Sequence, residues 1–315
     1  MHTHSHSHVP QTGKSREKEI YHITIIGSIV NILLTVLKFI AGIAGASAAM
    51  IADAVHSLSD LLTDFVVLLF VRFSSRPADS DHPSGHGKYE TLATTIVAIA
   101  LIAAGGILLA GGVQKIAGAI NGEALVMPGR LALWAALISI GAKEAVYWAT
   151  IAVAKRVDSP ALKANAWHHR TDALSSVATA LGIGGALLLG GQWAILDPIA
   201  AVLVSVFIIV TAVKMLAEAI QELMEKSLPE EVEKEIREIA QKDSDMSEMH
   251  HLRTRRVGSI YSIDMHLRMR GSTSLYEAHR HSMLLEQRLR ERFGPETLIS
   301  IHIEPLKVNG VYQPD

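Results

Sequence analysis

Two stretches of 24 residues, Thr91–Gln114 and Ala173–Leu196, contain no Asp, Glu, Lys or Arg. At 1.5 Å per residue, a helix of this length can cross the hydrocarbon core of a bilayer, which is about 30 Å thick. Four more apolar segments are interrupted only by single polar residues. We therefore predict six transmembrane helices, at about residues 20–45, 48–73, 88–118, 128–154, 160–189 and 195–222.

The composition changes near residue 222. The last 94 of the 315 residues contain about half of the charged side chains. Over the whole chain, 49% of residues are hydrophobic and 19% are charged, which argues against an ordinary cytosolic enzyme. The net charge of -2 provides no strongly basic surface, so we do not expect nucleic acid as a partner.

The charged region after Pro229 has a pattern of its own. A helical period covers residues 230–241, an alternating strand begins at Ile260, a helix spans about 275–292, and a second alternating strand covers 299–304. This order of helix, one or two strands, helix and strand predicts an α+β domain with a ferredoxin-like fold. The expected division is a histidine-rich tail at 1–19, a six-helix transmembrane domain at 20–222 and a cytoplasmic domain at 223–315.

Basic residues in the short connections predict the orientation in the membrane. An even number of crossings leaves both termini on one side, and cytoplasmic connections carry an excess of Lys and Arg. We therefore expect both termini in the cytoplasm of a cell whose inner membrane holds the protein. The residues that carry this prediction are Lys14, Arg16, Lys18, Arg72, Arg76, Lys88, Lys155, Arg156 and Lys163.

Histidine is abundant and cysteine is absent. With sixteen histidines and no cysteine, any metal site must use nitrogen and oxygen ligands. Four of the histidines alternate with small polar residues in Met1–His8, a segment that cannot form a core. We expect this tail to capture metal weakly near an entrance, with an inert tail or a tag remnant as the alternative.

Ionisable residues within predicted membrane helices are expensive and therefore suggest function. Asp53, His56, Asp60 and Asp64 share one face of the second helix, and His56 and Asp60 are one turn apart. The same H-x-x-x-D spacing recurs 112 residues later as His168 and Asp172 in the fifth helix.

The second and fifth helices run in opposite directions, as in the inverted repeats of transporters, so the two motifs can meet near the midplane. Two imidazoles and two carboxylates suit Zn²⁺ well, and Fe²⁺, Co²⁺ or Mn²⁺ less decisively. Other interpretations remain open: a packed histidine, Asp60 paired only with Lys143 or Lys38, and His169 in place of His168.

Two further groups of residues have metal-ligand character. In the polar loop before the third helix, His82 and His86 could share an ion with Asp79 or Asp81, although a solvated turn would show the same residues. In the cytoplasmic domain, His302 and Glu304 are two apart on a strand and so point to the same face, and His266 lies on the polar face of its strand.

Taken together, these motifs and their order resemble the cation diffusion facilitator family over nearly the whole chain. The resemblance rests on Asp53–Asp60, the loop Asp81–Lys88, the second H-x-x-x-D and the charged C-terminal region. It implies a homodimer that exchanges cytoplasmic divalent metal for protons. The ligands it implies are His56, Asp60, His168 and Asp172 for transport, Asp79, His82 and His86 in the loop, and His250, His266, His279, His302 and Glu304 in a cytoplasmic metal-binding and dimerisation domain.

The resemblance implies three finer features. His251 and His281 are neighbours that could substitute in the cytoplasmic cluster. Lys88 matches a lysine that pairs with an acidic residue after the sixth helix, here Glu222 or Glu225. Relatives with only carboxylates in the helix-five motif favour Mn²⁺, and His168 argues against that choice.

The resulting hypothesis is a proton-coupled exporter of Zn²⁺ that is not an enzyme. Metal binding needs neutral histidine and ionised aspartate, so protons compete for the same ligands. The alternatives are export of Fe²⁺ or Mn²⁺, and a metal-responsive membrane scaffold that does not transport. A membrane metalloenzyme is disfavoured because no water-activating base is evident beside an open ligand position.

Overall fold

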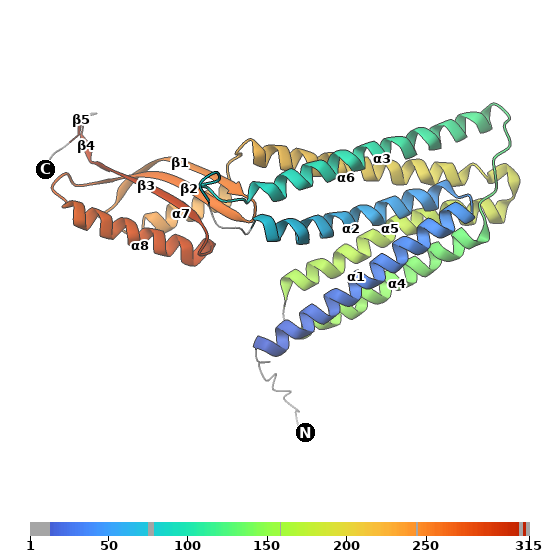
Figure 1. The fold of residues 1–315 in the computed structure, drawn as a ribbon, viewed down its shortest axis with the longest axis horizontal. Helices are drawn as coiled ribbons and strands as arrows, with labels where there is room; N and C mark the ends of the chain where they lie inside the picture. Colours follow the sequence, from blue (N-terminus) through green and yellow to red (C-terminus); the bar gives the residue numbers. More distant parts are fainter. Residues whose placement is uncertain (1–12, 75–78, 158, 244, 309–310, 313–315) are drawn as a thin grey trace, which may run out of the picture. The chain divides into compact units, whose positions relative to one another are not determined.

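The computed structural model describes residues 13–74, 79–157, 159–243, 245–308 and 311–312 (Figure 1). The chain divides into two compact units. The first combines Met1–Phe65 with Val97–Val213, and the second combines Val66–Ile96 with Lys214–Asp315. The predicted role of the tail at 1–19 rests on histidines that lie outside the described residues.

Six long helices make up the region before residue 224. They are α1 (Gly13–Ala44), α2 (Ala48–Ser74), α3 (Lys88–Ile120), α4 (Arg130–Arg156), α5 (Pro160–Leu189) and α6 (Leu196–Leu223). Within the described residues, five helical segments are long and apolar enough to cross a membrane, and they belong to α1, α3, α4, α5 and α6. The remaining long helix, α2, carries the aspartates Asp53, Asp60 and Asp64 of the predicted polar face. The predicted class of fold, a helical membrane region followed by an α+β domain, is confirmed.

Small residues allow the helices of the first unit to approach closely. Its buried core is rich in alanine, including Ala41, Ala49 and Ala136. A Cβ atom added to Gly182 of α5 would lie 2.4 Å from the Cβ of Ala200 in α6, so only glycine fits there. Such close backbone approach is how membrane helices gain packing energy without a hydrophobic driving force.

The start of α2 is fixed by a residue from α6. Asp197 accepts hydrogen bonds from the hydroxyl of Ser47 and from the backbone N–H of Ala48, at 2.5 and 2.8 Å. A carboxylate at a helix N-terminus satisfies otherwise unpaired N–H groups and interacts favourably with the helix dipole. This contact holds the beginning of the helix that carries the first H-x-x-x-D motif.

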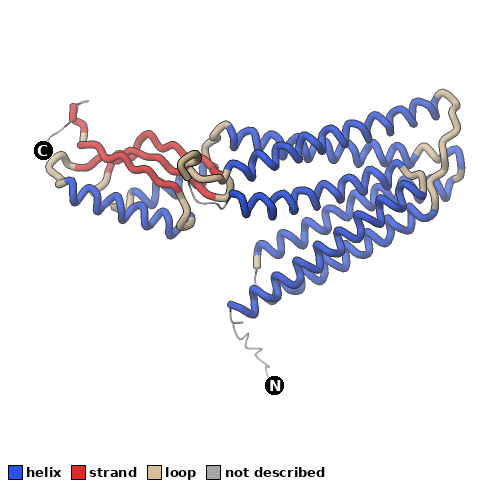
Figure 2. Tube along the Cα trace, in the orientation of Figure 1, coloured by secondary structure: helices blue, strands red, loops and turns tan. Residues whose placement is uncertain are grey.

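The C-terminal part of the second unit is a layer of helices on a sheet. Figure 2 shows the strands of this part in red with helices along them. The elements are α7 (Glu230–Ala240), β1 (Ser247–Val257), β2 (Ile260–Met269), α8 (Leu275–Phe293) and β3 (Leu298–Pro305), followed by the short β4 (Lys307–Val308) and β5 (Val311–Tyr312). The sheet order is β1-β2-β3, with β1 antiparallel and β3 parallel to β2. Alternate residues of β2, such as Ile263, Met265 and Leu267, are buried against the helices.

Candidate metal sites

The two H-x-x-x-D motifs meet in the first unit. Ligand atoms of His56, Asp60 and Asp172 lie within 4.8 Å of one another, a set that we call the membrane group. His56 and Asp172 are buried, and the His56 ring packs edge-on against Phe207 of α6 with ring centroids 5.3 Å apart. Three of the four predicted transport ligands therefore converge.

The fourth predicted ligand, His168, lies at the edge of the membrane group. Its Nδ1 is 3.5 Å from Oδ1 of Asp172, and its side chain is 56% exposed. His169, the alternative, is partly buried and lies beside Gly27 of α1, where an added Cβ would be 3.3 Å from its Nε2. The structure thus associates His168 with Asp172 but does not bring it into the three-residue group.

Two polar atoms of the membrane group, one in His56 and one in Asp172, lack hydrogen-bond partners among the described residues. Among the described residues, Nε2 of His56 and Oδ2 of Asp172 are buried without one. Buried polar atoms without partners are uncommon and need an explanation, such as a role in binding an ion. An imidazole nitrogen and carboxylate oxygens are suitable ligands for a divalent transition metal.

Asp53 shares the predicted face of α2 but takes part in a different interaction. Its Oδ2 is 2.9 Å from Nζ of Lys38 in α1, and both side chains are fully buried. The hydroxyls of Ser175 and Ser176 in α5 donate to the same carboxylate at 2.7 and 2.9 Å. The sequence suggests Lys38 and Lys143 only as partners of Asp60, whereas the structure pairs Lys38 with Asp53 and places Lys143 beside Asp172.

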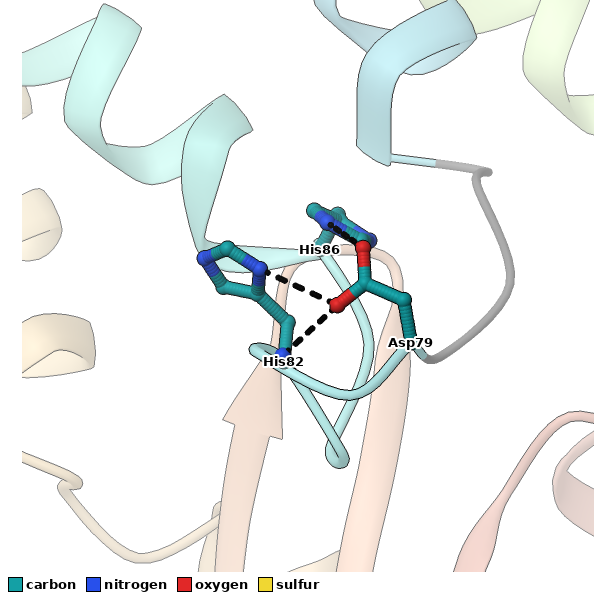
Figure 3. A group of neighbouring side chains, drawn as sticks. All are labelled: Asp79, His82 and His86. Carbon is teal, nitrogen blue, oxygen red and sulfur yellow. Dashed lines mark hydrogen bonds and ion pairs between the residues drawn. The ribbon is translucent and has the colours of Figure 1, made fainter.

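The loop before α3 gathers the second predicted set, Asp79, His82 and His86, which we call the loop group (Figure 3). Nδ1 of His82 is 3.3 Å from Oδ1 of Asp79, and Nε2 of His86 is 3.3 Å from Oδ2. The backbone N–H groups of His82 and Asp81 donate to Asp79 and hold the pKa of its carboxyl below its usual range. Asp79 is therefore an ionised acceptor between two imidazoles.

The third predicted set lies across the sheet. His250, His266 and His302 are direct neighbours on β1, β2 and β3, and ligand atoms of His250, His266 and Glu304 come together in what we call the sheet group. Oε1 of Glu304 is 3.2 Å from Nδ1 of His266 and 3.8 Å from Nε2 of the more exposed His302. Burial alone would raise the pKa of Glu304, but its hydrogen bond with His266 contributes to a net lowering.

His279, the remaining predicted ligand of the cytoplasmic domain, is not part of the sheet group. It lies on an exposed face of α8 together with Tyr276 and Met283. Its neighbour His281 points instead toward Asp243, with Nδ1 2.7 Å from Oδ2, and Asp245 lies nearby. Although burial would raise the pKa of Asp243, the bond from His281 helps to hold it below its usual value.

The lysine expected to form an ion pair at the start of α3 has its partner after α6. Nζ of Lys88 is 2.9 Å from Oε1 of Glu225, which confirms one of the two predicted partners. The other, Glu222, accepts hydrogen bonds from the hydroxyl of Thr91 and from the backbone N–H of Gly258 in the turn between β1 and β2. This turn also packs against Gly87, because an added Cβ on Gly258 would lie 2.6 Å from the Gly87 carbonyl oxygen.

Family models match both parts of the chain. Residues 24–224 match the cation efflux transmembrane domain, and residues 228–306 match the cation efflux protein cytoplasmic domain. The magnetosome protein MamM of Paramagnetospirillum magneticum is 34% identical over 81% of this chain and 78% of its own length. The manganese efflux system protein MneP of Bacillus subtilis is 29% identical over 92% of this chain and 97% of its own length. Metal tolerance protein C1 of Arabidopsis thaliana is 31% identical over 96% of this chain, which spans 65% of the length of that relative.

Proposed function

The chain belongs to the cation efflux family, and on that premise we propose that it exports divalent metal ions from the cytoplasm in exchange for protons. It acts as a multi-pass membrane transporter and not as an enzyme. The observation that carries the proposal is the convergence of His56, Asp60 and Asp172 from the two repeated motifs on α2 and α5. His168, beside Asp172, completes the ligand set during transport.

Zn²⁺ is the proposed principal substrate. An imidazole with two carboxylates, joined by a second imidazole, matches the nitrogen and oxygen sites that bind this ion. Mn²⁺ is the second candidate, because carboxylates suit it and the gathered ligands contain two carboxylates but one imidazole. The name of the Bacillus subtilis relative, a manganese efflux system protein, adds weight to the second candidate. Fe²⁺ fits the same donors but has no separate observation in its favour.

Proton exchange supplies the driving force in this proposal. Moving two positive charges outward against an inside-negative potential of 100 mV costs about 4.6 kcal/mol. Because protonation of histidine or aspartate removes a metal ligand, protons that enter from outside displace the metal there. On the cytoplasmic side, binding of metal releases those protons.

The loop and sheet groups are proposed cytoplasmic sensors of metal in a homodimer. Support for this role comes from position: the loop group ends at His86, next to Gly87, which packs against the β1–β2 turn of the domain that carries the sheet group. The matched cytoplasmic domain of the family covers this sheet. Both chain termini and this domain then face the cytoplasm, with the helices in the inner membrane.

Uptake into proteoliposomes tests the proposal. Vesicles that contain the purified protein should accumulate Zn²⁺ when a pH gradient is imposed, and collapsing the gradient should stop uptake. Asp60→Ala and Asp172→Ala should abolish uptake, whereas Glu218→Gln, an exposed carboxylate of α6, should transport normally. Parallel assays with Mn²⁺ decide between the two substrates. Normal transport by both aspartate variants would refute the membrane group as the transport site, and inactive wild-type protein would favour the scaffold hypothesis.

A further inference from the structure

A second lysine–aspartate pair adjoins the membrane group. Lys143 of α4 is 2% exposed, and its Nζ lies 3.6 Å from Oδ2 of Asp172. Within the described residues, neither this nitrogen nor this oxygen has a hydrogen-bond partner. The ammonium is thus close enough to neutralise the carboxylate without being fixed to it by a hydrogen bond.

An unbonded ammonium in a buried position is unusual. A lysine offers three N–H donors, and leaving them unpaired away from water is costly unless the charge serves another group. Lys38, which is also buried, contrasts with this because its Nζ lies 2.9 Å from each of three acceptors, Asp53, Ser57 and Ser176. Among the described residues, Nζ of Lys143 has no hydrogen-bond acceptor, and its charged neighbour is Asp172, a proposed metal ligand.

A metal ion and Lys143 would compete for the same oxygen. With His56 neutral, Asp60 and Asp172 contribute two negative charges and Lys143 one positive charge. An ion bound at about 2.2 Å from Oδ2 of Asp172 would lie within about 5.8 Å of the ammonium in its present position. Like charges at this distance in a poorly polarisable interior repel each other strongly. Binding of metal therefore favours movement of the lysine away from Asp172.

We propose that Lys143 is a built-in counter-ion that neutralises Asp172 in the empty membrane group and is displaced by the incoming divalent cation. The inference rests on the proposed function and makes Lys143 a positioning and affinity-setting residue for the transported metal. It requires no change in the protonation of the lysine. Its consequence is weaker metal binding and easier release, together with less uncompensated charge in the carrier when it returns empty.

A purely structural role for Lys143 predicts a different result. If the lysine only ties α4 to α5, its replacement by a neutral side chain should lower stability and leave metal affinity unchanged or weaker. A counter-ion predicts tighter binding. The sign of the change in Kd therefore separates the two roles.

The test measures Zn²⁺ and Mn²⁺ binding to the full chain in detergent. A background with His82→Ala, His266→Ala and His281→Ala disables the loop group, the sheet group and the cluster of His281 with Asp243 and Asp245, and serine replaces the four tail histidines of Met1–His8. Of the metal-ligating groups that the described residues form, the membrane group then remains. In this background we expect Lys143→Met and Lys143→Gln to lower the Kd by about tenfold or more. Lys143→Arg, which keeps the charge, and Lys155→Met, an exposed lysine on the same helix, should leave the Kd within about twofold.

Two outcomes distinguish failure of this inference from failure of the proposed function. An unchanged or higher Kd in the folded Met or Gln variant overturns the counter-ion role. Asp172→Asn in the same background should abolish binding. If it instead binds metal as the background does, the proposed transport site itself is wrong.

Discussion

The described residues of the helical unit include two buried lysine–aspartate pairs, which differ in how their charged atoms are hydrogen-bonded. In the first pair, Lys38 and Asp53 are 2.9 Å apart and serine hydroxyls surround both groups. In the second pair, Lys143 and Asp172 are 3.6 Å apart, and Nζ and Oδ2 have no hydrogen-bond partner among the described residues. The same two residue types therefore form a satisfied structural link in one place and an unsatisfied, responsive site in the other.

The difference shows how a membrane protein separates structural charges from functional ones. A buried ion pair is tolerated when hydrogen bonds complete its shell, and its loss is then a loss of stability. A buried pair with unfilled donors and acceptors can instead accept a ligand. Asp172 belongs to the second H-x-x-x-D motif, and Asp53 lies just before the first. Their different roles in this account therefore come from their surroundings and not from the residue type.

The largest effect is expected from breaking the first pair. Lys38→Met leaves the carboxylate of Asp53 without its counter-charge in a fully buried position, which should lower the free energy of unfolding by about 3–5 kcal/mol. SDS titration of the protein in mixed micelles measures this value. The double variant Lys38→Met with Asp53→Leu should recover part of the loss. Wild-type stability of the single variant would show that the first pair is not a structural link.

The second pair should respond to metal. At a free Zn²⁺ concentration one hundred times the Kd, binding to the folded state should stabilise the protein by about 2.7 kcal/mol. In the background that lacks the loop and sheet groups, Asp172→Asn should lose this stabilisation. Ser176→Ala, which removes two hydrogen bonds from the first pair, should keep it. Equal loss in both variants would mean that the two pairs act as one network.

The smallest effect is expected from an exposed pair outside the membrane. The hydrogen bond and charge of Lys88 hold the pKa of Glu225 below its ordinary value of 4.5. The stability that this pairing contributes is therefore present at neutral pH and is lost as the pH falls through the folded-state pKa. In Lys88→Met, the carboxyl carbon of Glu225 should titrate at a higher pH in NMR spectra, with little change in overall stability. If Glu225 titrates at the same pH in the variant as in the wild type, Lys88 is not the cause of its lowered pKa.

The sequence predicted the helices well and one strand poorly. Apolar length and the surrounding charges place each helix within a few residues, except that α1 begins at Gly13 instead of near residue 20. The sequence leaves open whether one or two strands precede α8, and β1 is hard to recognise since its pairing with β2 shifts register twice and Glu248 and His251 have positive φ angles. Such bulges disrupt the alternation of side chains by which a strand is recognised.

The sequence predicts which motifs form the candidate sites, but it does not predict which individual side chains contact each other. Spacing places Asp53, His56 and Asp60 on one face of α2, but only the neighbouring helices decide that Asp53 meets Lys38 while Asp60 joins His56 and Asp172. The rotation of α5 likewise leaves His168 mostly exposed. The sequence suggests Lys143 only as a partner of Asp60, and its position beside Asp172 depends on how α4 packs against α5.

A crystal structure of the Zn²⁺-loaded protein, with anomalous diffraction recorded at the zinc edge, tests the central claim most directly. We predict an anomalous peak at about 2.0–2.2 Å from Nε2 of His56 and from carboxylate oxygens of Asp60 and Asp172. Nζ of Lys143 should lie farther from Oδ2 of Asp172 than its present 3.6 Å. No peak among these three residues, in crystals whose loop and sheet groups are occupied, would contradict the account.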